Sequence, residues 1–160
     1  MTKLWIAAAL ILFLCAALGA QDRLAIALAQ FQHEADPVHK ARLLAKFGDD
    51  QVELARKQLK SDDDVASLHT LEVYRDEVHD TVAGLKGTRI DAEKKTAGFK
   101  ELQISLRETI RHIDDLIFTL PVDKRPFFRV VRDDLTRDQN ELIDALFPRK
   151  LDQNSKKPNP

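Results

Sequence analysis

The sequence predicts an all-α fold, an antiparallel helical bundle of three long helices preceded by two or three short helices. Apolar residues recur at spacings of three and four over long stretches of the 160-residue chain, which is the period of a helix that buries one face. The alternation that marks a half-buried strand is missing. The few glycines and prolines lie at segment ends, which suits long helices better than a sheet with many turns.

The first 20 residues predict a secretory signal peptide. Lys3 provides a positive charge, residues 4–18 are uncharged and almost wholly apolar, and the small residues Gly19 and Ala20 follow; this order is typical of a cleaved leader. We therefore expect an exported protein, periplasmic or secreted. The alternative is an uncleaved membrane tether through residues 4–20, because an apolar run of about 17 residues is close to the shortest that spans a bilayer.

The cysteine count limits the chemistry of the exported chain. Cys15 is the only cysteine and lies inside the leader, so the mature protein can form neither a disulfide nor a thiolate metal site. Leu14 stands before it, where a lipoprotein signal would need a small residue. The formal net charge of −1 argues against nucleic-acid binding, which favours a clearly basic domain.

Residues 21–60 predict the short N-terminal helices. Asp36 and Pro37 favour a helix start, since Asp is a good N-cap and Pro suits the first helical position. Gly48 fits the end of that helix, and Asp49 or Asp50 can cap the next one. The apolar residues expected to face inward are Leu24, Leu28, Phe31, Val38, Ala41, Leu44, Phe47, Val52, Ala55 and Leu59.

The first long helix is predicted from Ser61 to Gly87. The acidic residues that follow Ser61 suit the positive end of a helix dipole, and Gly87 favours a C-terminal stop. Its expected inward face consists of Val65, Leu68, Leu71, Tyr74, Val78, Val82 and Leu85.

The second long helix is expected to begin between Thr88 and Asp91 and to end at Pro121. Its apolar seam follows the heptad-like spacing of a bundle helix, and it consists of Phe99, Leu102, Leu106, Ile110, Ile113, Ile117 and Leu120.

The third long helix is expected between Asp123, as its cap, and Pro148. Its face is broken midway at Asp138 or Gln139, and residues 149–160 predict a polar, disordered tail. The apolar residues of this face are Phe128, Val131, Leu135, Leu142 and Leu146.

Short connections predict how these helices pack. Residues 87–90 and 121–123 leave few residues between successive helices, and short links place successive helices antiparallel. We therefore expect residues 61–148 to form an up-down-up bundle, with the short helices of residues 21–60 covering its open side.

Two groups of potential metal ligands lie on the predicted long helices. Each has a histidine and two carboxylates at i, i+4 and i+7, and such spacings occur in helical-bundle metal sites. Pairing of Glu with a basic residue one turn on is the more ordinary interpretation. The groups are Glu72, Asp76 and His79 on one helix, and Glu108, His112 and Asp115 on the next.

Other chemistry has weaker support. His33 and His39 flank the Asp36–Pro37 turn and could converge on zinc, but structural zinc needs four ligands, so a capped turn is favoured. The serines lack a Gly-flanked nucleophile elbow, and no Gly-rich phosphate loop is present. We predict no cofactor.

The sequence therefore favours a non-enzymatic bundle that works by contact in the cell envelope. It would dock to a protein partner or self-associate through a helix face, and the seam from Phe99 to Leu120 is the candidate surface if the bundle is incomplete. Simple core packing is the alternative for that seam. The alternative function is a metal- or small-ligand-binding bundle in the periplasm.

Overall fold

A computed structural model describes residues 24–148 and confirms the all-α bundle: these residues form six helices and no strand. The predicted signal peptide and the predicted disordered tail lie outside the described residues. Between residues 24 and 148, we find no helix whose length and apolar character would let it cross a bilayer.

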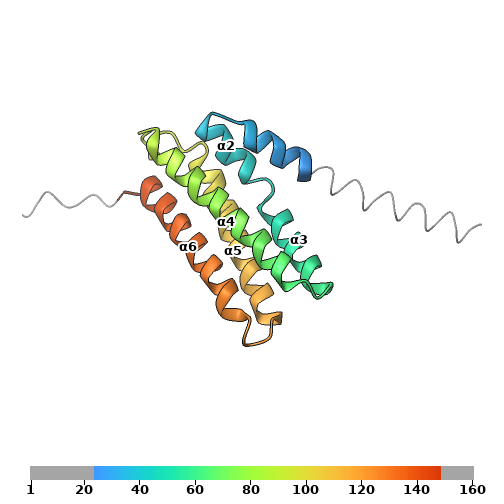
Figure 1. Cartoon of the computed structure of the whole chain (residues 1–160). Coiled ribbons are helices and arrows are strands. Elements are labelled where there is room, and N and C mark those ends of the chain that lie inside the picture. The colour runs from blue at the N-terminus through green and yellow to red at the C-terminus, as the bar shows by residue number, and fades with distance from the viewer. Residues whose placement is uncertain (1–23, 149–160) are drawn as a thin grey trace, which may run out of the picture.

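The helices follow one another with short turns, except before α5 (Figure 1). Residues 24–33 are helical and precede the five labelled helices. These are α2 (Pro37–Leu44), α3 (Gly48–Lys60), α4 (Asp64–Gly87), α5 (Phe99–Thr119) and α6 (Arg125–Leu146).

The bundle has four corners, because α2 and α3 together take the place of a fourth long helix. α4 packs against α2, α3 and α6, and α5 packs against the same three helices. α4 and α5 are therefore diagonally opposite, and in Figure 1 they overlap between α6 on one side and α2 and α3 on the other. The expected up-down-up order holds, but α4 and α5 are not the neighbours that a short connection would make them.

The neighbours α4 and α6 run parallel. Arg75 of α4 lies 3.7 Å from Asp134 of α6, and one turn later His79 lies 3.1 Å from Asp138. Two successive helices and the turn between them make a hairpin. The last four helices therefore form two hairpins, α3–α4 and α5–α6, which pack side by side with α4 parallel to α6.

The expected start of α5 between Thr88 and Asp91 was wrong, because residues 88–98 form a connection to the diagonal corner. Gly98 ends this connection with φ 81°, and a Cβ there would lie 3.1 Å from the Val38 carbonyl oxygen. Glycine alone adopts such a backbone without strain, so α5 begins at Phe99. The Glu101 side chain accepts a hydrogen bond from the Gly98 N–H at 2.8 Å.

Three other helix ends differ from the expected ones. α4 begins at Asp64, with Asp63 as its cap, and not at Ser61, which ends α3. Gly48 begins α3 instead of ending α2, and the Asp49 side chain is not its cap. Asp123 does not cap α6 either; Lys124 precedes the helix and pairs with Asp64 of α4. The cap of α2 is confirmed, since Asp36 accepts hydrogen bonds from the N–H groups of two residues that follow it.

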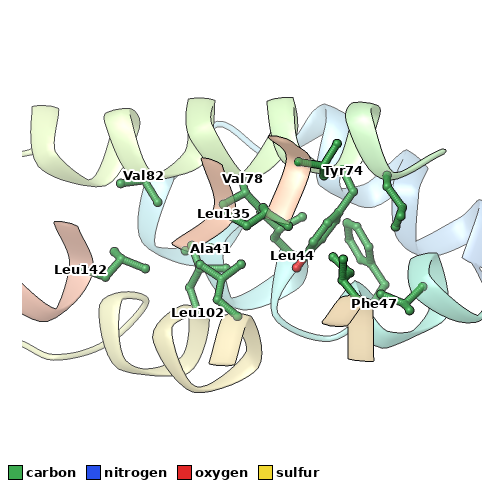
Figure 2. Close-up of a cluster of buried hydrophobic side chains, with 14 of the residues drawn as sticks. Ala41, Leu44, Phe47, Tyr74, Val78, Val82, Leu102, Leu135 and Leu142 are labelled. Carbon is green, nitrogen blue, oxygen red and sulfur yellow. The ribbon is translucent and has the colours of Figure 1, made fainter. Parts of the chain in front are cut away.

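The core contains nearly all of the predicted apolar residues, and Figure 2 shows Tyr74 of α4 extending toward Leu44 and Phe47. The seam from Phe99 to Leu120 is part of this core, so its interpretation as a docking surface was wrong. Val65 was also expected to face inward, but it is 81% exposed, because the buried face of α4 starts at Ser67.

Candidate functional site

Two histidine–aspartate pairs join the two hairpins. His79 Nδ1 of α4 lies 3.1 Å from Asp138 Oδ1 of α6, and His112 Nδ1 of α5 lies 3.0 Å from Asp49 Oδ1 of α3. Each pair links two parallel helices from different hairpins. The sequence analysis named both histidines as candidate metal ligands. Their carboxylate partners lie about 60 residues away along the chain, and no sequence pattern around Asp49 indicated that it pairs with His112.

The His112 pair continues into the core through a buried hydroxyl. Thr109 lies one turn before His112 on α5 and is fully buried, and its Oγ1 donates to Asp49 Oδ1 at 3.5 Å. Asp49 therefore accepts from two residues of α5 and fixes the first turn of α3 against that helix. Since the Thr109 hydroxyl is fully buried, no substrate can reach it as it stands, and the hydrogen bond serves packing.

Gly48 leaves room for the tyrosine hydroxyl beside this cluster. A Cβ on Gly48 would lie 2.5 Å from the Tyr74 hydroxyl oxygen and 2.8 Å from Thr109 Oγ1. The Tyr74 hydroxyl is buried and has no hydrogen-bond partner within residues 24–148. Burial raises the pKa of this hydroxyl, so it remains neutral.

The His79 pair lies in a charged surface groove along α4 and α6. This groove has a volume of about 400 Å³. Asp138 is only 3% exposed, and burial raises the pKa of its carboxyl although the hydrogen bond from His79 opposes that change. The other charged side chains of this groove form ion pairs with one another: Arg75 pairs with Asp76 at 2.8 Å, and Arg137 pairs with Asp134 at 2.9 Å.

The two predicted metal-ligand groups are not assembled by the fold. They stand on α4 and α5, which are diagonal instead of adjacent, and the described part of the chain contains no group of three His, Cys, Asp or Glu side chains that could hold a metal ion. Arg75 engages Asp76, and Arg107 and Arg111 both engage Glu108.

The remaining predicted ligands are unassembled as well. Glu72 is half-buried and Asp115 is exposed. His79 and His112 each pair with an aspartate of another helix. Metal binding therefore stays a prediction without geometric support.

Glu77 is a half-buried acid that the sequence analysis did not single out. Its Oε2 has no hydrogen-bond partner within the described residues, and burial raises the pKa of its carboxyl from 4.5 to about 7, although Lys40 of α2 opposes that shift. The carboxyl of Glu77, on α4, therefore interacts electrostatically with Lys40 of α2.

Glu77→Gln is expected to remove a pH dependence of stability. The folded chain holds this proton more tightly than the unfolded chain, so the stability of the wild type falls as the pH rises from about 4.5 to about 7. Because the carboxyl is partly exposed, we take only part of this pKa shift as stability. Relative to the wild type, Glu77→Gln is expected to be more stable by about 1 kcal/mol at about pH 8 than at about pH 5. Urea denaturation of both proteins at the two pH values measures this, and an equal pH response would contradict it.

Large apolar side chains stay exposed at one end of the bundle. We call the following five residues the apolar end: Val65, Phe118, Val122, Phe127 and Val130 are 81%, 77%, 76%, 61% and 56% exposed. They surround the connection between α5 and α6 and the start of α4, which Lys124 and Asp64 hold together.

No protein-family model matches the chain, and neither curated proteins nor solved structures show significant similarity to it.

Proposed function

We propose that this chain is an exported, non-enzymatic helical bundle that acts through protein–protein contact in the cell envelope. The observation that supports it is the apolar end. Five large apolar side chains are exposed around the helix ends there, and exposed apolar surface beside polar residues is typical of a contact surface.

The polar clusters favour the same role. The groove beside His79 is lined by charges that already pair with one another, and the Thr109 hydroxyl is buried beneath Asp49. Both clusters stabilise the packing of the two hairpins, so the exposed apolar residues are the surface left for a partner.

Double substitution of Phe118 and Phe127 by serine is expected to abolish capture of a specific envelope partner by the purified protein. Both rings are mostly exposed, so serine removes apolar contact area and leaves the core intact. Ile26→Ser is the matched control, because Ile26 is also 59% exposed but lies in the helix at the other end of the chain (Figure 1).

Two results would contradict the proposed function. The first is full capture by the Phe118→Ser and Phe127→Ser protein. The second is stoichiometric metal in the purified protein, which would favour the ligand-binding alternative. N-terminal sequencing tests the export, because a mature chain that starts at Ala20 or Gln21 means that the leader is cleaved.

A further inference from the structure

A groove of about 610 Å³ lies between the start of α5, the end of α6 and the connection that precedes α5. It is at the end of the bundle opposite the turn between α5 and α6 (Figure 1), and it shares no residue with the apolar end. Clefts that hold small ligands commonly have volumes of about 300–1,000 Å³. The groove therefore has room for a small molecule.

One part of the groove is apolar. Ile104 of α5 lines it together with Leu146 and Phe147 from the end of α6. Ile104 is 41% exposed and Phe147 is 72% exposed, so both side chains still have apolar surface to bury, whereas Leu146 already belongs to the core. An apolar chain lying on this part would remove that surface from water, which is favourable.

Another part of the groove carries hydrogen-bond donors. Lys100 lies one helical turn before Ile104 on the same face of α5, and the side chains of Thr96 and Gln103 also line the groove. An ammonium, a hydroxyl and an amide can all donate. None of these three side chains has a hydrogen-bond or ion-pair partner among residues 24–148. The groove thus offers three donors to an anion and apolar surface to a chain attached to it.

The acids near Lys100 are engaged by other groups. Glu93 is the one acid in the lining, and it takes part in another interaction. Asp91 pairs with Lys94 at 3.2 Å. Glu101 accepts a hydrogen bond from the backbone N–H of the residue that precedes α5. The ammonium group of Lys100 is therefore available to an external anion.

The surroundings of the groove are also positive. Residues 88–101 contain four cations and three acids, and Arg89 and Lys95 form no ion pair with any residue that the structure describes. Asp144 of α6 is exposed but does not line the groove. Charge complementarity therefore favours a negatively charged ligand here over a positively charged one.

We propose that this groove binds a fatty acid. Its carboxylate accepts hydrogen bonds from Lys100 and the two donors beside it, and its acyl chain covers Ile104 and Phe147. A molecule with one anionic head and one apolar chain matches both parts of the groove. An inorganic anion leaves the apolar part uncovered, and an uncharged chain leaves the lysine unpaired. This binding site goes beyond the proposed contact function, which rests on the apolar end.

Isothermal titration calorimetry of the purified protein tests the site with three probes. Decanoate has both the head and the chain, decanol has the chain without the charge, and acetate has the charge without the chain. We expect decanoate to bind, decanol to bind about fivefold more weakly because one exposed charge pair is lost, and acetate to show no binding. Acetate that binds as tightly as decanoate would contradict a role for the apolar part.

Two substitutions in the groove separate its parts. Lys100→Gln should weaken decanoate binding by about fivefold and leave decanol binding unchanged. Ile104→Ser should weaken the binding of both by about fivefold, because apolar contact is lost. Both side chains are exposed, so we expect the variants to fold, and circular dichroism checks this.

The matched controls are Lys57→Gln and Phe118→Ser. Lys57 is an exposed lysine of α3 without an ion-pair partner in the described residues, and Phe118 is 77% exposed at the other end of α5. Both control variants should bind decanoate like the wild type. Absence of decanoate binding by the wild type would overturn the proposal, as would wild-type affinity in both groove variants. Neither result would contradict the proposed contact function, since capture of a partner tests that function at Phe118 and Phe127.

Discussion

Leu71→Ala is expected to lower the free energy of unfolding by about 2–5 kcal/mol, the range for truncation of a fully buried leucine. Leu71 is 0% exposed and belongs to the core between α4 and its neighbours. The loss has two parts, the apolar transfer of the removed carbons and the cavity that close packing leaves behind. Guanidinium denaturation measures it.

Val65→Ala is the control for this prediction. Both residues belong to the apolar pattern that the sequence assigns to the inward face of α4, yet Val65 is 81% exposed. Its truncation is expected to change the unfolding free energy by less than about 0.5 kcal/mol, as exposed substitutions do. Equal losses for Leu71→Ala and Val65→Ala would show that α4 is rotated or starts elsewhere.

Gly48→Ala is expected to destabilise the fold by about 1–3 kcal/mol, the range for an overpacked core. The added Cβ would stand 2.5 Å from the Tyr74 hydroxyl oxygen, and the tyrosine ring is buried and cannot move aside easily. Helix propensity alone would give the opposite sign, since alanine is favoured over glycine within a helix by up to about 1 kcal/mol. The sign of the change therefore reports the close contact.

Tyr74→Phe is expected to reverse most of this loss. It removes the oxygen that meets the new Cβ, and that hydroxyl has no hydrogen-bond partner in the described residues, so Tyr74→Phe alone should be neutral or stabilising. Thermal unfolding of the two single variants and the double variant gives the coupling energy. Additive effects would contradict a contact between these two positions.

Local patterns predicted where most helices are and what begins or ends them. Asp36 caps α2 through its own side chain, and α4 ends at Gly87 as expected, because caps and stops depend on residues within one turn. The start of α5 could not be predicted in this way. Residues 88–98 lack a strong helix breaker until Gly98, and the need for a long connection arises only from the diagonal place of α5.

The candidate sites were predicted less well, for the same reason. His79 and His112 were recognised as notable, but spacing along one helix assigned them to carboxylates of their own helix. The structure pairs them with Asp138 and Asp49. Asp138 carried one signal, since it interrupts an apolar seam, and a carboxylate in such a place needs a partner when it is buried.

The sequence by itself determined that this protein is helical and which face of each long helix is apolar, because hydrogen bonds within a helix and the three-four spacing are local properties. Only the tertiary structure decided which helices are neighbours and which histidine meets which aspartate. The paired residues lie about 60 positions apart in the chain. They meet because whole hairpins pack together, and the residues next to them in the sequence do not determine this packing.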